Sequence, residues 1–230
     1  FLHIDGFSEV MIGTNITGEL LVTNPFPSII ILERDCDILG TLSLSNTSDV
    51  TISASPDDAN AMITTLNVED NLGPRIPLRF AGSGGISIEH VNEPSAPAST
   101  SGGSIDLSNL TGGFDNNFAG AEFGNGFDFL VGDLHRASNI RLASTPGAAS
   151  EILFGSDLHT IVTIYNLDRD DHIDLGQLGV SSFADLTIIY SSGVSHIRGN
   201  TFSGEIDVAS IDLTLPGIAA SYIDFNGHIG

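Results

Sequence analysis

A glycine-rich segment has the residue types and the spacing of a calcium-binding turn. Residues 123–131 read Phe-Gly-Asn-Gly-Phe-Asp-Phe-Leu-Val, which places Gly124, Gly126 and Asp128 in the register of the nonapeptide G-G-x-G-x-D-x-U-x, where U is a large apolar residue. The glycines permit a left-handed turn that directs carbonyl oxygens at an ion, and the aspartate supplies negative charge. Phe123 replaces the first glycine, and the flanking segments are degenerate. We therefore predict a partial calcium site; the alternative is a glycine turn with a solvated aspartate.

A second group of carboxylates, Asp168, Asp170 and Asp171, follows an alternating segment. Its D-x-D-x beginning is similar to the start of an EF-hand loop. Ile173 stands where that loop needs glycine, and Gly179 stands where it needs glutamate, so we reject an EF-hand. Two interpretations stay open for the three aspartates, namely calcium ligands or a solvated acidic turn.

The motifs of several enzyme classes are absent. The seven histidines show neither H-x-x-x-H nor H-x-H spacing, and neither H-E-x-x-H nor a G-x-S-x-G elbow occurs. A phosphate loop that ends in Lys-Ser/Thr is excluded because the chain contains no lysine. Carboxylate pairs for glycoside hydrolysis stay open, since 29 acidic residues offer many pairs by chance. We predict that this chain is not an enzyme.

The charge balance indicates which partners suit the surface. The 29 acidic residues and seven basic residues, all arginine, give a formal net charge of −22. Such a surface repels phosphates, so nucleic acid and anionic membranes are poor partners, whereas calcium outside the cell suits it. The single cysteine, Cys36, cannot form an internal disulfide, and no apolar run approaches the 18 or so residues of a membrane span. These features favour a secreted or cell-surface protein.

Short runs of isoleucine, valine and threonine between glycine, asparagine and aspartate predict an all-β fold of many short strands, either a sandwich or barrel or a parallel β-solenoid. At most one short helix is expected, over Asp57–Leu66, with a strand over Ala61–Val68 as the alternative. The Pro-, Ala- and Ser-rich segment 92–103 reads as a linker or exposed loop. We therefore predict an N-terminal β region over 1–91 and a C-terminal β region over 104–230.

The last third of the chain resembles the C-terminal region of RTX proteins, which are bacterial proteins exported by type I secretion. The resemblance follows the order of the segments Asp171–Leu175, Ser182–Ile188, His196-Ile197, Gly204–Val208, Leu213 and Asp224-Phe225. It implies a terminal β unit and an export signal, and it names no activity.

We expect an extracellular structural protein that assembles with copies of itself into a surface layer or a filament. Acidic β chains rich in threonine, serine and glycine suit assembly by strand pairing and calcium bridges, and open edge strands favour polymers. The alternating segment Phe1–Gly13 is a candidate edge strand that one copy donates to the next. The alternative is a calcium-dependent secretion or binding module of a larger adhesin or enzyme.

Overall fold

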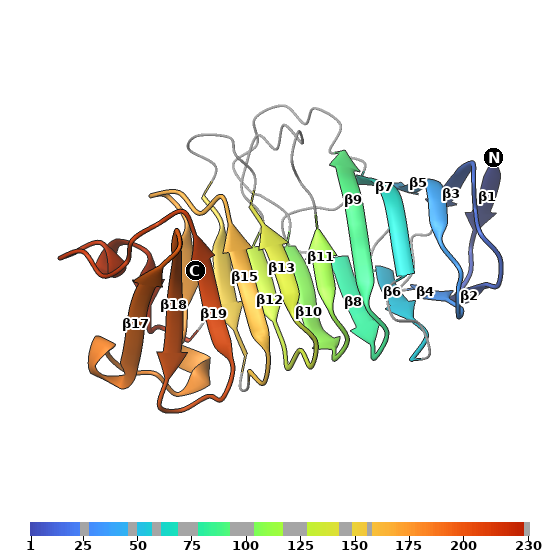
Figure 1. Ribbon diagram of the computed structural model, residues 1–230. Coiled ribbons are helices and arrows are strands. Elements are labelled where there is room, and N and C mark those ends of the chain that lie inside the picture. Colours follow the sequence, from blue (N-terminus) through green and yellow to red (C-terminus); the bar gives the residue numbers. More distant parts are fainter. Residues whose placement is uncertain are drawn as a thin grey trace.

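The chain forms a parallel β-solenoid, in which successive strands alternate between two sheets that face each other across one hydrophobic core. The computed structural model describes residues 1–23, 28–45, 50–56, 61–68, 78–92, 104–116, 128–142, 149–155 and 158–227. Figure 1 shows the coils side by side, with the N-terminus at one end of the stack and the last strands at the other. The prediction of an all-β fold is confirmed, and of the predicted architectures the chain adopts the solenoid.

Eleven strands build the first sheet and nine build the second. The parallel part of the first sheet consists of β1 (Leu2–Asp5), β3 (Glu19–Thr23), β5 (Ile38–Ser45), β7 (Ala61–Val68), β9 (Ile86–Asn92), β11 (Phe114–Asn116), β13 (Ser138–Arg141), β15 (Ile161–Tyr165) and β19 (Glu205–Ala209). The antiparallel strands β18 (Val194–Gly199) and β17 (Leu186–Ser191) complete it. The second sheet consists of β2 (Glu9–Ile12), β4 (Ser28–Leu32), β6 (Val50–Ala54), β8 (Leu78–Gly82), β10 (Ser104–Leu110), β12 (Asp128–Val131), β14 (Glu151–Phe154), β16 (His172–Asp174) and β20 (Ile223–Asp224).

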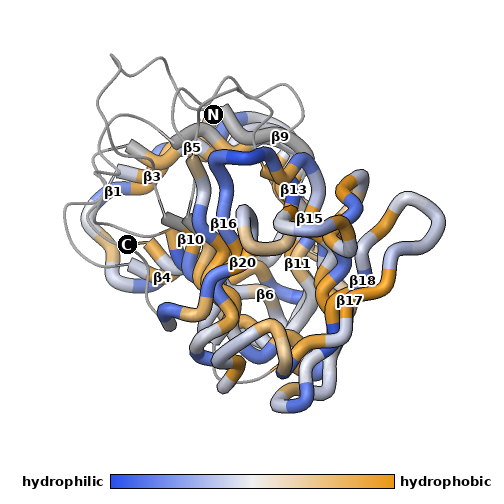
Figure 2. Tube along the Cα trace, turned by 90° about the vertical axis from the view of Figure 1, so that its left-hand side faces the viewer, coloured by the Kyte–Doolittle hydropathy of each residue, from blue (hydrophilic) through white to orange (hydrophobic). Residues whose placement is uncertain are grey.

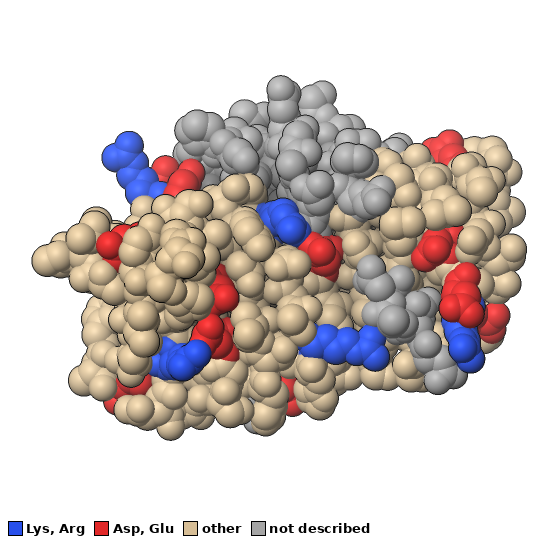
Figure 3. Space-filling view, viewed as in Figure 1, with Lys and Arg blue, Asp and Glu red and all other residues tan. Residues whose placement is uncertain are grey.

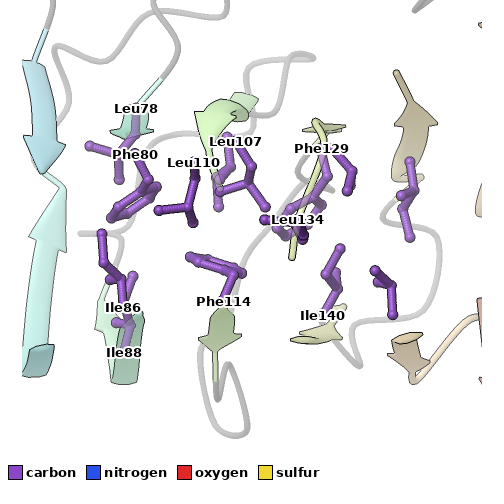
Figure 4. Close-up of a cluster of buried hydrophobic side chains, with 14 of the residues drawn as sticks. Leu78, Phe80, Ile86, Ile88, Leu107, Leu110, Phe114, Phe129, Leu134 and Ile140 are labelled. Atoms are coloured by element: carbon purple, nitrogen blue, oxygen red, sulfur yellow. The ribbon is translucent and has the colours of Figure 1, made fainter. Parts of the chain in front are cut away.

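Alternation of apolar and polar residues along each strand produces the core. The inward side chains of paired strands stack into ladders, of which Leu20, Leu42 and Leu66 form one. Large residues from the two sheets then meet between them, and the rings of Phe80 and Phe114 lie 5.4 Å apart between centroids (Figure 4). Each such side chain contributes about 1.5–3 kcal/mol when it is fully buried. The ladders therefore hold neighbouring coils in register as well as excluding water.

The turns between strands vary in length, which hides the repeat in the sequence. Paired residues of adjacent coils lie 18 positions apart between β1 and β3, as Leu2 and Leu20 do, but 44 positions apart between β15 and β19, as Ile161 and Glu205 do. Viewed along the stack, the strands of successive coils lie behind one another, and the β17–β18 hairpin projects beside them (Figure 2). The strands therefore give successive coils the same cross-section, and the coils differ in the number of residues between the strands.

Two expectations about local structure are corrected. The predicted helix over Asp57–Leu66 is wrong from residue 61 onward, where the chain forms the strand Ala61–Val68 that we weighed as the alternative. Met62 and Ile63 alternate between half-buried and buried, so a period of two fits the core of a sheet better than a helical face. The segment Phe1–Gly13 is two strands rather than one. Gly6 has φ 69°, and the turn there sends β1 and β2 into different sheets.

The sheets continue across the predicted linker. β8 pairs with β10 and β9 pairs with β11, so strands from both predicted regions share each sheet. Their buried side chains belong to one cluster. Residues 93–103 of the predicted linker lie outside the described part of the chain.

An irregular segment closes the C-terminal end of the stack. After β16, the 3-10 helices η1 (Gly176–Leu178) and η2 (Phe183–Asp185) precede the β17–β18 hairpin, and η3 (Ala219–Ser221) precedes β20. Apolar side chains from these connections are buried in the common core: Leu175, Leu178, Val180, Phe202 and Leu213. Because they follow the last full coil, they cover core residues that another coil would otherwise have to cover.

Close backbone contact between coils leads to a stability prediction. Gly40 lies in β5, and a Cβ atom added there would press far inside van der Waals contact with the carbonyl oxygen of Gly18 in the preceding coil. The same backbone holds the two coils together, since Thr41 N–H donates to Gly18 O at 3.1 Å. We expect Gly40→Ala to lower the free energy of unfolding by about 1–3 kcal/mol, as overpacked cores do. Urea unfolding monitored by circular dichroism measures the change.

The matched control for that experiment is Gly18→Ala. A Cβ atom at Gly18 would have its nearest neighbour, Phe1 N, at an ordinary 3.5 Å. This variant should unfold within about 0.5 kcal/mol of the wild type. Equal losses in the two variants would contradict the steric explanation.

Candidate functional site

Two clusters of histidine and carboxylate side chains lie on the C-terminal part of the solenoid. The first, which we call the histidine–aspartate cluster, consists of Asp133, His135 and His159. His159 Nδ1 lies 2.7 Å from Asp133 Oδ1, and His135 Nε2 lies 3.1 Å from Asp133 Oδ2. The hydrogen bond from His159 is the main cause that lowers the pKa of Asp133, and His135 adds to it while burial opposes it. Asp133 therefore stays ionised between two imidazoles.

The solenoid brings the two histidines together because they occupy equivalent turns of adjacent coils. His135 precedes β13 and His159 precedes β15, and they lie 24 residues apart, as do the paired residues Ser138 and Val162. Their rings meet edge to face, with 5.9 Å between centroids. Our search for short-range histidine motifs missed this cluster. If the 24-residue length of this coil had been known, the equal spacing of His135 and His159 would have predicted the cluster.

The second cluster, which we call the hairpin cluster, consists of His196, Arg198, Glu205 and Asp207 on β18 and β19. His196 stands directly opposite Asp207 in the antiparallel register, and alternation along β19 puts Glu205 on the same face. His196 Nδ1 donates to Asp207 Oδ1 at 2.7 Å and lies 3.1 Å from Glu205 Oε1. Arg198 forms an ion pair with Glu205. Acidic and basic side chains accordingly adjoin over these strands (Figure 3).

The titration of the hairpin cluster is set by partial burial and by mutual hydrogen bonds. The hydrogen bond to Asp207 is the main cause that raises the pKa of His196, against partial desolvation. Burial raises the pKa of Asp207. Burial alone would also raise the pKa of Glu205, but hydrogen bonds from Arg198 and His196 and the charge of Arg198 lower it overall. Glu205 is therefore the more acidic of the two carboxyl groups.

A surface pocket connects the two clusters. It has a volume of about 520 Å³, and its lining includes His159 on one side and Arg198 and Glu205 on the other. A second depression of about 260 Å³ lies over the hairpin and includes Ile189 and His196 in its lining. The arrangement offers imidazole, carboxylate and guanidinium groups to a small polar ligand or to an ion at one surface.

The three aspartates of the predicted acidic turn lie close together, and Asp171, the most buried of them, accepts hydrogen bonds that hold the backbone. Asp171 is 1% exposed, and its two carboxylate oxygens accept the backbone N–H groups of Ser150 at 2.9 Å and of Asp168 at 2.8 Å. Asp168 Oδ1 accepts the backbone N–H of Asp170 at 2.8 Å. Burial raises the pKa of Asp171 to about 6, although the backbone hydrogen bonds oppose that shift. The carboxylates of Asp171 and Asp168 are thus engaged with the backbone, and calcium binding at this turn stays a prediction.

The glycine-rich segment is described only in part. Gly124 and Gly126 lie outside the described residues, and Asp128 begins β12, where it pairs with Ser104 of β10 in a parallel ladder. The predicted calcium site at these three residues stays a prediction. Of this segment, the structure describes Asp128–Val131, which form β12 beside β10 of the preceding coil.

No family model, curated protein or solved structure matches this chain. The resemblance of the last third to RTX proteins thus stays a prediction. In the structure that third forms the end of the stack, from β16 through the hairpin to β20. Within the described ranges, no helix has both the length and the apolar character that crossing a bilayer demands.

The hydrogen bonds of Asp171 make a testable contribution to stability. Asp171→Ala leaves the buried N–H of Ser150 and the half-buried N–H of Asp168 without their acceptor, and we expect the free energy of unfolding to fall by about 1–3 kcal/mol. Asp170→Ala, which removes an exposed carboxylate one position away, should change it by less than about 0.5 kcal/mol. Urea unfolding without calcium and with an excess of calcium measures both changes. A calcium-dependent stabilisation that the Asp170 variant alone loses would instead assign an ion-binding role to the turn.

The hairpin cluster predicts a pH dependence with a defined sign. Because the folded state raises the pKa of His196, its pairing with Asp207 contributes stability that is complete below the usual histidine pKa of about 6.5 and is lost as the pH rises through the folded value. An NMR titration of the His196 ring should give a pKa above 6.5, and Asp207→Asn should lower it. Equal pKa values in the two proteins would contradict the assigned pairing.

Proposed function

We propose that this chain is a non-catalytic structural solenoid that associates with a second copy of itself through its N-terminal end. The single observation that supports this proposal is the pair of edge strands there. Within the described residues, β1 pairs only with β3, and β2 pairs only with β4. Their outer edges continue the two sheets with the same backbone groups that join every coil to the next. Open edges of this kind are templates for another chain.

The side chains and the backbone at this end both suit pairing. Met11 in β2 is 58% exposed and Leu2 in β1 is 45% exposed, so each of the two edge strands carries an exposed apolar side chain. The carbonyl groups of Ser8 and Ile12 accept from β4, so the alternate residues Glu9 and Met11 direct their backbone groups toward the outer edge. A partner strand would therefore gain hydrogen bonds and apolar contact together.

The asymmetry of the stack selects the mode of pairing. At the C-terminal end, the connections around the β17–β18 hairpin bury side chains such as Leu178 and Phe202 over the last coil, so a further coil stacks less readily there than at the N-terminal end. We therefore propose an N-terminal end facing an N-terminal end about a two-fold axis, with β1 antiparallel to its own copy and β2 antiparallel to its own copy. Because Phe1–Gly13 is already paired with β3 and β4 in its own chain, edge pairing replaces the strand donation that we expected from the sequence.

Assembly into a filament or surface layer needs a second contact. The outer edge of β17 is the candidate, since it ends the first sheet and exposes Ile189 and Tyr190. We also propose that the protein works outside the cell and that calcium bridges its acidic surfaces. These points are supported by the net charge of −22 and by the presence of a single cysteine, Cys36, which cannot form a disulfide within the chain.

The alternative proposal is a calcium-dependent secretion or binding module of a larger adhesin or enzyme. It is supported by the parallel coils, because the nonapeptide calcium turn requires stacked coils of this kind. A gene much longer than 230 codons would favour this alternative.

Substitution of Met11 tests the proposed pairing. We expect the wild type to form dimers or larger species as its concentration rises, and Met11→Lys to stay monomeric because it places a charge on the outer edge of β2. The control is Leu215→Lys, which makes the same change in charge at a residue that is 53% exposed in the C-terminal part. It should associate as the wild type does. Sedimentation equilibrium and electron microscopy, each with calcium and with chelator, give the readout.

Two results would overturn the proposal: a wild type that is monomeric at all concentrations, and a Met11 variant that associates like the wild type. Association that only the Leu215 variant loses would also overturn it, because the interface would then lie at the C-terminal part. Circular dichroism of each variant establishes that loss of association is not loss of folding.

A further inference from the structure

The histidine–aspartate cluster has the donor set of a transition-metal site. It combines two imidazoles and one carboxylate, which ligate zinc in many open sites with three protein ligands. The ligand atoms His159 Nδ1, His135 Nε2 and an Asp133 oxygen lie within 4.8 Å of one another. Hard cations such as calcium prefer oxygen ligands alone, so the two nitrogen donors favour zinc or a similar metal over calcium.

The distances are close to those of a coordination sphere. Tetrahedral ligands with bonds of 2.0–2.2 Å to zinc lie about 3.3 Å from one another. Asp133 Oδ1 lies 2.7 Å from His159 Nδ1, and Asp133 Oδ2 lies 3.1 Å from His135 Nε2. Entry of an ion therefore requires these hydrogen bonds to open by up to about 0.6 Å, which side-chain rotation can supply. The protons that those hydrogen bonds use are displaced to solvent when the metal binds.

The coils fix the ligands in place before any ion arrives. His135 N–H donates to Thr111 O at 3.0 Å, and the backbone on either side of His159 accepts the amides of Gly204 and Glu205 through Leu158 O and Thr160 O. The coil before His135 and the coil after His159 thus anchor the backbone of the two histidine turns. Preorganised ligands of this kind favour tight binding, because little conformational entropy is lost on association.

The hairpin cluster is the weaker candidate, although it also brings one histidine and two carboxylates together. Arg198 is ion-paired with Glu205, and its fixed positive charge opposes a cation at that position. In the histidine–aspartate cluster, both Asp133 oxygens face imidazole nitrogens, and imidazole binds a metal ion in its neutral form.

We propose that Asp133, His135 and His159 bind one divalent transition-metal ion of the zinc type, with at least one coordination position open to solvent. The three side chains are 39%, 59% and 48% exposed, so the ion would be reached directly from the surface. His159 also lines the 520 Å³ pocket, and the open position can therefore be shared with a small ligand that enters that pocket. This site is independent of the proposed pairing at the N-terminal end.

Calorimetric titration of chelator-treated protein with zinc tests the proposal, in the presence of excess calcium. We expect one saturable site per chain. His159→Ala and His135→Ala should each weaken zinc binding by more than about 100-fold, because even the loss of a residue that only hydrogen-bonds to a metal ligand costs about 10–100-fold. Cobalt(II) in place of zinc should give the visible absorption of a low-coordinate site in the wild type and lose it in both variants.

His172→Ala is the matched control. His172 also faces a carboxylate, with its Nδ1 3.5 Å from Asp224 Oδ2, and its side chain is 46% exposed, but it lies outside the cluster. This variant should bind zinc as the wild type does. Equal weakening in the His172 and His159 variants, loss of the site in His196→Ala alone, or the absence of saturable zinc binding by the wild type would each overturn the proposal. All of these side chains are partly exposed, and circular dichroism verifies that the variants remain folded.

Discussion

The parallel backbone ladder between coils is the constraint on which the rest of the structure depends. Each strand inside the two sheets is paired on both sides, and its inward side chains stack on those of the coils before and after it, as Leu42 does between Leu20 and Leu66. No single coil can bury its own apolar face, so stability comes from residues of neighbouring coils that lie far away in the sequence. Close approach of backbones, such as Gly40 over Gly18, is the steric cost of this stacking.

A stack built in this way has two ends, and the chain treats them differently. At the C-terminal end the direction of pairing changes from parallel to antiparallel at β19, and the β17–β18 hairpin and the buried residues of the preceding segment complete the core. At the N-terminal end, β1 and β2 simply continue the two sheets. This difference between the two ends is the reason why we propose contact between two N-terminal ends.

The same repetition that builds the core also builds surface chemistry. Residues at equivalent positions of adjacent coils form columns along the outside, so a histidine on each of two coils becomes a pair. His135 and His159 meet in this way, and Asp133 completes the group from the same turn as His135. At the C-terminal end, where β18 and β19 are antiparallel, the strand register sets a different row of side chains. Asp207 of β19 lies there between Thr163 of β15 and His196 of β18. On this solenoid, side chains that lie together on the surface come from equivalent positions of adjacent coils rather than from one contiguous sequence motif.

The sequence by itself determined that this protein is built from short strands, because the alternation of apolar and polar residues and the glycine and asparagine turns are local signals. It predicted the strand Ala61–Val68 only as an alternative to a helix. The spacing of apolar residues over so short a segment does not distinguish a strand from a helix. The sequence drew attention to Asp171 because it lies in a cluster of aspartates. That cluster did not predict that Asp171 is buried and accepts hydrogen bonds from two backbone amides.

Only the tertiary structure decided which coils stack, that the sheets run across the predicted linker, and that His135 lies beside His159. The physical reason is that parallel pairing is set by hydrogen bonds and side-chain ladders between residues far apart in the chain. The loops between them differ in length and conceal the period.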